Sequence, residues 1–406
     1  MIPSFGTDGI RGQAGIAPLT PPILHNIGHA CAQAFGPHAQ ITLGRDTRRS
    51  GKWISEALSA GIIEGGGQLY DMGIVPTAAV SCAVVAERHT LGIMITASHN
   101  PWRDNGIKLF SSGGHKLSKA EQKILLQAMK APTKNEIKGS YQHSPDLINH
   151  WKEALPKPDL RGFSMLVDCA HGAAAPHAPE ILRSLGAQLK LRGCEPDGQN
   201  INDGVGALHP PQTTEGTDIA ICFDGDADRV SFVNTYAQQI DGDDVLWLLR
   251  NHFKGPLVGT VMSNGGLEKA LNGRLHRSAV GDAHVEELMT QLKSPLGAEQ
   301  SGHILFAQGL PTGDGLFSAL TLLSHIDLPL PKREWERWPV CKQNIRIDGA
   351  RIDLKTLTSI KVAESSGQRV IVRYSGTEPL LRIMVEGPQA AQHLTSISEE
   401  FLASQK

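Results

Sequence analysis

The sequence predicts an α/β protein built from three similar-sized units and a smaller C-terminal domain. Apolar, strand-like runs alternate with helical patterns along the chain, which is typical of α/β folds. The 406 residues exceed what a single compact core accommodates. Polar or proline-rich segments at about Pro132–Tyr141, Gln238–Gly242 and Leu328–Trp338 separate the units. We therefore expect domains at residues 1–138, 139–238, 239–332 and 333–406.

Each expected strand is a short apolar run bounded by loop-forming residues. In chain order these runs are Ile41–Gly44, Leu91–Ile95, Ser164–Asp168, Asp218–Phe223, Leu257–Met262, Arg369–Val372 and Leu381–Val385. Helices are expected from about Trp53 to Gly65 and near Pro179–Leu185, with Gly186 as the C-cap of the second helix.

The composition excludes several classes of protein. The formal net charge is −2 and no long run of one charge sign occurs, so we expect no nucleic-acid partner. No apolar stretch reaches the length of a membrane span, and the first residues lack the apolar core of a signal peptide. The six cysteines are scattered without a CxxC pair, which indicates neither a zinc site nor a disulfide framework. We therefore expect a cytoplasmic protein that does not bind a membrane.

A serine follows an apolar run that is expected to be a buried strand. Leu91–Ile95 forms this run, and the loop formers Thr96–Pro101 cannot continue it. Ser98 is thus held at the end of a strand, with His99 beside it and Lys108 ten residues further on. Open α/β sheets bind their ligands at such strand ends. For this segment taken alone, an ordinary exit from strand to loop is the alternative.

Three carboxylates occupy alternate positions directly after another expected strand. Asp224, Asp226 and Asp228 are separated by small residues, so they can turn toward one point. Mg²⁺ prefers oxygen ligands and keeps places for water or a phosphate, whereas three buried carboxylates without a cation would repel one another. A calcium loop fits poorly, because Arg229 and Thr235 stand where that loop needs glycine and glutamate. A solvated acidic turn is the remaining alternative.

Two further loops offer groups for a sugar and for a phosphate. Glu299, Ser301 and His303 lie in one glycine-flanked loop and supply an acceptor, a hydroxyl and a titratable group. Arg373–Pro379, between two expected strands, offers backbone N–H groups and hydroxyls, and Arg382 follows it. An ordinary polar turn and a plain hairpin turn are the respective alternatives.

The four loops together indicate one kind of chemistry. A serine at a strand end, a three-carboxylate metal loop, a sugar-type loop and a phosphate cradle are distributed one to each expected domain. Arg11, Arg45 and Arg48 add basic residues in glycine-bounded segments. The combination predicts phosphoryl transfer on a phosphosugar, with charge neutralised by a metal ion and by arginines.

These motifs resemble the α-D-phosphohexomutase family, most closely its phosphoglucosamine mutase branch. The resemblance covers nearly the whole chain, and Gln300 is its best indication of the substrate, since glucose and mannose mutases tend to carry methionine there. The segments that carry it are Phe5–Gly12 (FGTDGIRG), Thr96–Lys108 (TASHNPWRDNGIK), Val167–Ala173 (VDCAHGA), Gly193–Asn202 (GCEPDGQNIN), Asp224–Arg229 (DGDADR), Ala298–His303 (AEQSGH), Thr312–Gly315 (TGDG) and Arg373–Gly387 (RYSGTEPLLRIMVEG).

The resemblance implies both a fold and a reaction. The expected fold has three mixed-sheet α/β/α domains and a smaller α+β C-terminal domain around a central cleft. Ser98 would carry a phosphoryl group, and Asp224, Asp226 and Asp228 would hold Mg²⁺ together with an oxygen of that phosphoserine. The phosphoryl group would pass to O1 of glucosamine 6-phosphate. The bisphosphorylated intermediate would then return its 6-phosphoryl group to Ser98, leaving glucosamine 1-phosphate, a precursor of UDP-N-acetylglucosamine.

The remaining roles follow from this implied chemistry. Arg11 and Arg229 would stabilise the oxygens of the transferring group, and Lys108 and His303 are the candidate proton handlers. Glu299 would bind ring hydroxyls together with Ser301. The residues expected to hold the phosphate that is not reacting are Arg373, Ser375, Gly376, Thr377 and Arg382.

Other functions remain as alternatives to this prediction. The nearest is a phosphomannomutase/phosphoglucomutase acting on mannose or glucose phosphates. A metal-dependent phosphatase and a non-catalytic phosphosugar-binding regulator are further alternatives, although binding alone needs neither Ser98 nor the aspartates. The chain also departs from the glucosamine branch, being shorter between Gly206 and Thr217 and having Ala283 where arginine is usual. We expect a phosphosugar as the substrate and consider a homodimer as the assembly.

Overall fold

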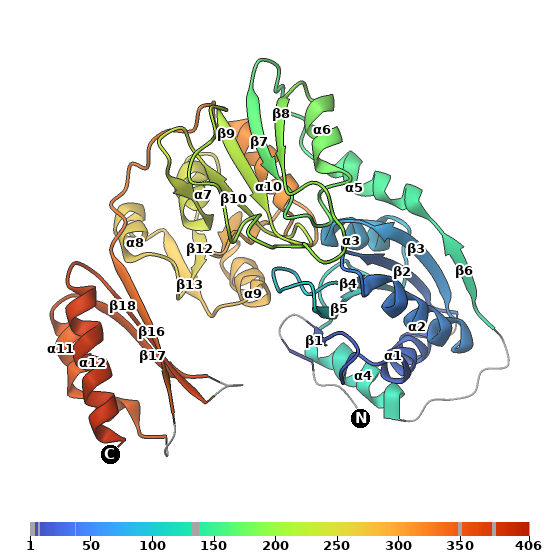
Figure 1. The fold of residues 1–406 in the computed structure, drawn as a ribbon, viewed down its shortest axis with the longest axis horizontal. Helices are drawn as coiled ribbons and strands as arrows, with labels where there is room; N and C mark the ends of the chain where they lie inside the picture. The colour runs from blue at the N-terminus through green and yellow to red at the C-terminus, as the bar shows by residue number, and fades with distance from the viewer. Residues whose placement is uncertain are drawn as a thin grey trace. The chain divides into compact units, whose positions relative to one another are not determined.

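The computed structural model describes residues 5–6, 9–36, 38–130, 138–347, 351–375 and 379–405 (Figure 1). The chain divides into two compact units. The first unit runs up to Met262 and also includes His276–Lys332, and the second comprises Ser263–Leu275 and the chain from Arg333 onward. Each unit is described by itself below.

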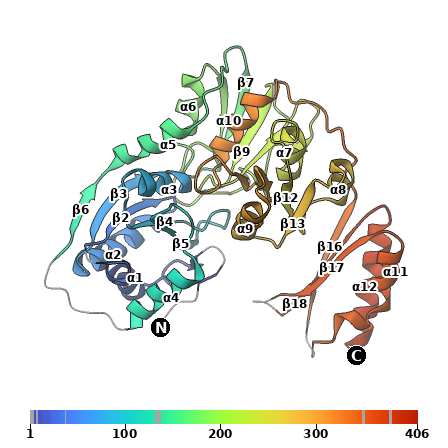
Figure 2. The same ribbon diagram turned by 180° about the vertical axis from the view of Figure 1, so that it is seen from behind.

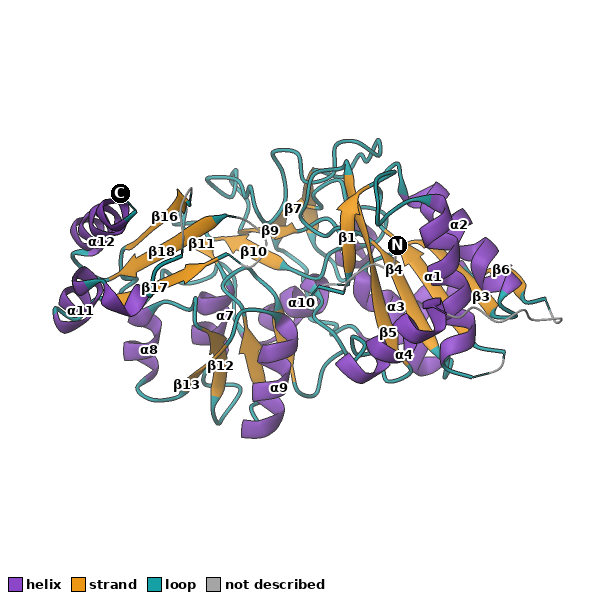
Figure 3. Cartoon of the chain, turned by 90° about the horizontal axis from the view of Figure 1, so that it is seen from below, coloured by secondary structure: helices purple, strands orange, loops and turns teal. Residues whose placement is uncertain are grey.

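The first sheet of the first unit has six strands in the order β1-β5-β4-β2-β3-β6. Strand β5 lies between β1 and β4 (Figure 3) and is antiparallel to both, and the other strand pairs are parallel. The strands are β1 (Ile10–Gln13), β2 (Gln40–Arg45), β3 (Gln68–Ile74), β4 (Leu91–Ile95), β5 (Asp104–Ser111) and β6 (Ser140–His143). The helices are α1 (Pro21–Ala34), α2 (Gly51–Glu64), α3 (Thr77–Ala86) and α4 (Lys119–Lys130).

Helices cover both faces of this sheet. Because side chains alternate along a strand, β2 and β4 direct Leu43 and Ile93 into the core shared with α1, α2 and α4, which lie together in Figure 2. On the other face, Gly44 and Gly92 let Val80 of α3 approach the strands closely. The strands expected at residues 41–44 and 91–95 and the helix expected after residue 53 are confirmed.

The linker expected at Pro132–Tyr141 is only partly described. Its residues 132–137 lie outside the described part of the chain. Its last residues belong to β6, which pairs in parallel with β3, so the prediction of a linker is wrong there. All four side chains of β6 are exposed, and an edge strand of this kind carries no apolar pattern to reveal it. Strand β6 lies just beyond the domain limit proposed at residue 138.

The second sheet has the order β11-β10-β9-β7-β8 and is mixed, because β10 is antiparallel to β9 whereas β7 is parallel to β8 and β9. Residues 193–218, all described, contain no helix or strand, in agreement with the expected loss of a longer segment. The elements are α5 (Ile148–Ala154), β7 (Ser164–Asp168), α6 (Ala178–Ser184), β8 (Gln188–Arg192), β9 (Ile219–Phe223), β10 (Val230–Val233) and β11 (Gln239–Ile240).

The third sheet has the order β13-β12-β14-β15, with β14 parallel to β12 and antiparallel to β15. Strand β12 ends two residues before the expected strand at 257–262 does. The elements are α7 (Gly242–Leu249), β12 (Leu257–Thr260), α8 (Gly265–Leu271), β13 (Leu275–Ser278), α9 (Asp282–Leu292), β14 (Leu296–Ala298), β15 (Ile304–Phe306) and α10 (Gly315–His325). Helix α8 belongs to the second unit.

The second unit is built on an antiparallel sheet in the order β16-β18-β17. Its core includes Leu381, Ile383 and Val385 of β18, packed with Ile397 and Phe401. The elements are β16 (Val340–Arg346), α11 (Thr358–Ser365), β17 (Arg369–Tyr374), β18 (Leu380–Glu386) and α12 (Ala390–Ser404).

The predicted fold class is confirmed: three mixed-sheet α/β domains are followed by a smaller α+β domain. Among the helices that the structure describes, none has the length and apolar character needed to cross a membrane. The domain limits at residues 138, 238 and 332 stay our proposal.

Candidate active site

Ser98 stands in a tight, buried turn at the end of β4. Its backbone has φ = +51°, in the left-handed region, and its exposed fraction is 1%. Its N–H donates to Oγ1 of Thr96 over 2.8 Å. A residue other than glycine seldom adopts this conformation, and such strain persists where the surrounding structure holds it, often at functional sites.

The acidic loop brings its three carboxylates to the Ser98 hydroxyl. The loop connects β9 to β10, and Asp224, Asp226 and Asp228 are all buried. One ligand oxygen from each carboxylate lies within 4.8 Å of the others. Ser98 Oγ donates to Asp224 Oδ2 over 2.7 Å. The serine and the metal loop, which the sequence placed in different domains, therefore meet.

Lys108 forms ion pairs with two of these carboxylates. It lies on β5, which pairs with β4, so it reaches the site from beside the serine strand. Its Nζ donates to Asp226 Oδ2 and Asp228 Oδ2, each over 2.6 Å, and the Lys108 side chain is 2% exposed. Thr77 Oγ1 also donates to Asp226 Oδ2, over 2.5 Å.

The carboxylates differ in how readily they ionise. Burial raises the pKa of Asp224 well above its usual value, and the neighbouring Asp228 and Asp226 raise it further. Burial also disfavours ionisation of Asp228, but Lys108 and then His303 outweigh it and hold the pKa of Asp228 well below its usual value. A carboxylate cluster of this kind needs additional positive charge to ionise fully.

The residues present fit a hard divalent cation. Asp226 Oδ1 and Asp228 Oδ1 are buried and accept no hydrogen bond among the described residues. Oxygen-only donor sets of clustered carboxylates suit Mg²⁺ better than softer metals. The cluster thus has both the donor chemistry and the unused acceptor capacity that such an ion requires.

Three other predicted residues lie around this cluster. The Arg229 N–H donates to Asp224 Oδ1 over 3.2 Å. His303 Nδ1 lies 3.8 Å from Asp228 Oδ1. Arg11 Nη1 donates to the carbonyl of Ala97, next to Ser98, over 3.4 Å. The structure therefore brings all the predicted catalytic and metal-ligating residues together in the first unit.

The sugar-type loop is anchored beside the acidic loop. The carbonyl of Gly302 accepts from the N–H of Val230, the first residue of β10, over 3.0 Å. Glu299 is buried and its Oε1 accepts from the N–H of Gly281 over 2.8 Å. Ser301 is exposed. Gln300 Nε2 donates to the buried Asp243 Oδ2 over 3.3 Å.

The predicted phosphate residues belong to the second unit. Arg373 of β17 and Arg382 of β18 face each other in register on the antiparallel sheet. Ser375 is buried, and its N–H donates to the carbonyl of Leu380 over 2.8 Å. Gly376 and Thr377 lie outside the described residues.

Sequence reasoning missed several residues at this site. Thr77 donates to Asp226, and Asn202 donates to the Ser98 carbonyl. Neither residue lies in a local sequence pattern that predicts such a contact. His99 was noted only as a neighbour, and its Nδ1 lies 3.2 Å from Ser98 Oγ. Burial, followed by Arg229 and Arg11, lowers the pKa of His99 to about 4, so its ring is neutral at neutral pH.

Gly225 is expected to tolerate no side chain. A Cβ on Gly225 would lie 2.5 Å from the Ser98 carbonyl oxygen and 2.8 Å from Asn202 Nδ2. We expect Gly225→Ala to destabilise the protein by about 1–3 kcal/mol through overpacking. Denaturant unfolding measures this loss. Gly113→Ala is the control, because its Cβ would meet only side-chain atoms at ordinary contact distance, His115 at 3.4 Å and Ser111 at 3.9 Å.

Comparison with known protein families agrees with this geometry. Four phosphoglucomutase/phosphomannomutase domains match in order: alpha/beta/alpha domain I at residues 3–136, domain II at 145–237, domain III at 241–332 and the C-terminal domain at 347–404. The chain therefore belongs to the phosphoglucomutase/phosphomannomutase family.

Curated relatives narrow the resemblance to one branch. A phosphoglucosamine mutase from Symbiobacterium thermophilum is 39% identical over 95% of this chain and 95% of its own length. Another from Rhizobium rhizogenes is 40% identical over 96% and 95%, respectively. Among solved structures, a phosphoglucomutase/phosphomannomutase family protein from Burkholderia thailandensis has a TM-score of 0.78 at 22% identity, covering 98% of this chain and 97% of that one. The resemblance to the phosphoglucosamine mutase branch is thus confirmed.

Proposed function

We propose that this chain converts glucosamine 6-phosphate to glucosamine 1-phosphate through a phosphoserine at Ser98 and a bisphosphorylated sugar intermediate. The observation that carries the proposal is the 2.7 Å contact between Ser98 Oγ and Asp224 within a buried triad of aspartates. An alcohol held against clustered carboxylates is suited to carry a phosphoryl group once a cation neutralises the charge.

The reaction consists of two phosphoryl transfers, one from Ser98 to the sugar and one from the sugar back to Ser98. In the first, the bond from phosphorus to Ser98 Oγ breaks as a bond forms to O1 of the sugar, whose hydroxyl loses its proton. In the second, after the intermediate has turned over, Ser98 Oγ takes the phosphoryl group from O6, and O6 regains a proton. Lys108 and His303, both buried beside Asp228, are the groups we assign to hold and return these protons.

Charge on the transferring group is spread over several partners. Asp224, Asp226 and Asp228 would hold Mg²⁺ together with an oxygen of phosphorylated Ser98. When bound, that ion supplies positive charge that weakens the repulsion between the phosphoryl oxygens and the carboxylates. Arg11 and Arg229 add guanidinium donors to the same oxygens.

Two groups of residues are assigned to substrate recognition. Glu299 and Ser301 bind ring hydroxyls on whichever face of the sugar is presented. The distal phosphate is recognised as a phosphate alone, so the cradle accepts the intermediate in both orientations. The residues we assign to this cradle are Arg373, Ser375, Gly376, Thr377 and Arg382.

The proposed metabolic role follows from the reaction. Glucosamine 1-phosphate is the precursor of UDP-N-acetylglucosamine, so we assign the chain to amino-sugar metabolism in the cytoplasm. We also propose a homodimer, which the molar mass in solution tests directly.

The substrate assignment is tested by comparing kcat/KM for glucosamine 6-phosphate with that for mannose 1-phosphate and glucose 1-phosphate, each with added magnesium. The proposal expects the amino sugar to be preferred by at least tenfold. A preference for mannose or glucose phosphate would make the chain a phosphomannomutase/phosphoglucomutase. Release of inorganic phosphate without isomerisation would make it a phosphatase and contradict the proposal.

A further inference from the structure

We propose that Arg48 and Asn202 are positioning residues that hold the main chain of residues 98–104 and thereby fix the Ser98 hydroxyl against the acidic loop. This inference rests on the proposed function and adds to it the two residues that set the geometry of the phosphoryl-carrying serine. Neither residue reaches the reacting atoms through its own side chain. Both act through the carbonyl oxygens of the serine turn, as described below.

Arg48 is buried beneath the serine turn, with an exposed fraction of 1%. Nη2 donates to the carbonyls of Ser98 and Asn100, each over 2.8 Å. Nη1 donates to the carbonyls of Pro101, over 2.5 Å, and Asp104, over 3.0 Å. Nε donates to Asp46 Oδ2 over 2.9 Å. A guanidinium has five N–H donors in a fixed planar fork, and here all five have acceptors.

Asp46 extends the same network to the N–H of the serine. Its Oδ2 accepts from Thr96 Oγ1 over 2.7 Å, and Thr96 Oγ1 accepts from the Ser98 N–H over 2.8 Å. Its Oδ1 accepts from the Arg48 N–H over 3.0 Å. The peptide groups on both sides of Ser98 are therefore held by one buried ion pair, that of Arg48 and Asp46.

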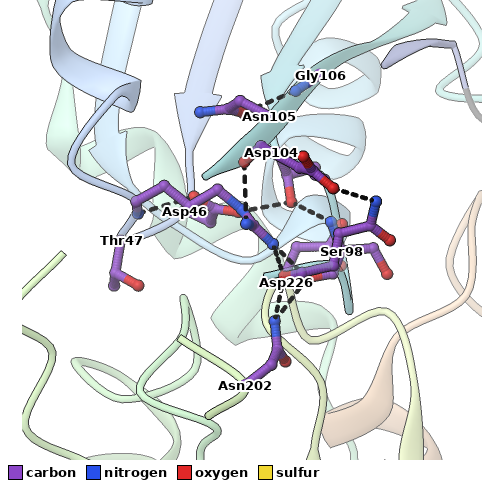
Figure 4. Close-up of polar contacts among 12 residues, drawn as sticks. Asp46, Thr47, Ser98, Asp104, Asn105, Gly106, Asn202 and Asp226 are labelled. Carbon is purple, nitrogen blue, oxygen red and sulfur yellow. Dashed lines mark hydrogen bonds and ion pairs between the residues drawn. The ribbon is translucent and has the colours of Figure 1, made fainter. Parts of the chain in front are cut away.

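Asn202, in the domain of the second sheet, binds two of the carbonyls that Arg48 binds. Its Nδ2 donates to the carbonyls of Ser98, over 2.9 Å, and Asn100, over 3.2 Å, as Figure 4 shows for its approach to the serine turn. Its own N–H donates to the carbonyl of Ala170 over 2.9 Å. A Cβ on Gly225 of the acidic loop would meet both the Ser98 carbonyl and Asn202 Nδ2. One amide thus links the serine turn to the domain that carries the aspartates.

This arrangement matters because Ser98 adopts a left-handed conformation that it would not keep unaided. Its Oγ must stay beside the acidic loop, so that the phosphoryl group it would carry lies next to Asp224, Asp226 and Asp228. A displacement of about 1 Å costs about 10²-fold in rate. A lysine at position 48 keeps the charge but has three donors on a flexible stem, so it cannot bind four carbonyls and Asp46 at once.

The test compares Arg48→Lys and Asn202→Gly with the wild-type enzyme. For Arg48→Lys we expect kcat to fall about 10²-fold, with KM for glucosamine 6-phosphate within about threefold of wild type, because the sugar contacts are untouched. Asn202→Gly, which removes the amide donor and suits the left-handed backbone of residue 202 (φ = +61°), should lower kcat in the same direction. Circular dichroism and single-turnover transfer from glucose 1,6-bisphosphate to dephosphorylated Ser98 are measured for each variant.

Arg49→Lys is the matched control. Arg49 is the next residue, its side chain is exposed, and only its N–H makes a hydrogen bond to the loop at Gly198. The control should keep wild-type kcat and transfer rate. If Arg48→Lys fails to fold, Asn202→Gly decides the question alone.

The outcomes separate the two proposals. A selective loss of kcat and of the transfer rate in folded variants supports the positioning role. Transfer rates within about threefold of wild type in either folded variant would overturn it while leaving the proposed function in place. If the wild-type enzyme itself transferred no phosphoryl group to Ser98, the proposed function would fail, and the positioning role with it.

Discussion

Ser98→Ala is expected to lower mutase kcat by about 10⁴-fold or more, because the variant lacks the hydroxyl that we assign to give a phosphoryl group to O1 and to take one from O6. The side chain is small and its Oγ makes the hydrogen bond to Asp224, so its removal leaves the surrounding packing nearly unchanged. We expect cooperative unfolding close to that of the wild type. A coupled assay for glucosamine 1-phosphate measures the loss.

Ser111→Ala is the matched control for this variant. Ser111 is the last residue of β5, and its Oγ donates only to the carbonyl of His115, over 3.2 Å. The control should retain wild-type turnover. If folded Ser98→Ala retained more than a tenth of wild-type kcat, Ser98 would not be the phosphoryl carrier.

Asp226→Asn is expected to lower both magnesium affinity and turnover. The substitution removes one of three charged ligands from a buried site and leaves Lys108 with one carboxylate partner instead of two. We expect a loss of about 4 kcal/mol of transition-state stabilisation, which corresponds to about 10³-fold in kcat. Calorimetric titration of the metal-free protein with magnesium measures the affinity independently of turnover.

Removal of the metal ion provides a second test of the same cluster. Chelation should abolish turnover of the wild type, and added magnesium should restore it. Asp203→Asn, in an exposed position of the same domain, is the control and should bind magnesium as the wild type does. Equal magnesium affinity in Asp226→Asn and wild type would show that the aspartates are not the metal site.

The sequence allowed the central strands of the sheets to be predicted, but not every edge strand. Strand β4 and strand β9 are buried along their whole length, so a continuous apolar run identified both and placed Ser98 and Asp224 at strand ends. Strand β6 has only exposed side chains. Its place is set by backbone pairing with β3, which leaves no trace in the side-chain pattern.

The candidate site was predicted residue by residue, but its organisation was not. Ser98 and Asp224 follow strands of two different sheets, and only the packing of these sheets' domains brings Ser98 Oγ to 2.7 Å from Asp224 Oδ2. Arg48 was noted as a basic residue near a glycine, whereas it lies buried and donates to main-chain carbonyls. Every residue has a main-chain carbonyl, so the sequence does not show which carbonyls a buried arginine will bind.

The central claim is that the phosphoryl group resides on Ser98 beside the aspartate cluster. The most direct measurement is peptide mapping by mass spectrometry after the dephosphorylated enzyme is incubated with a bisphosphorylated hexose and magnesium. We predict that one phosphoryl group is added, on the peptide containing Ser98, and that none is added when magnesium is absent. Phosphate found on another residue, or turnover without any phosphorylated peptide, would contradict this account.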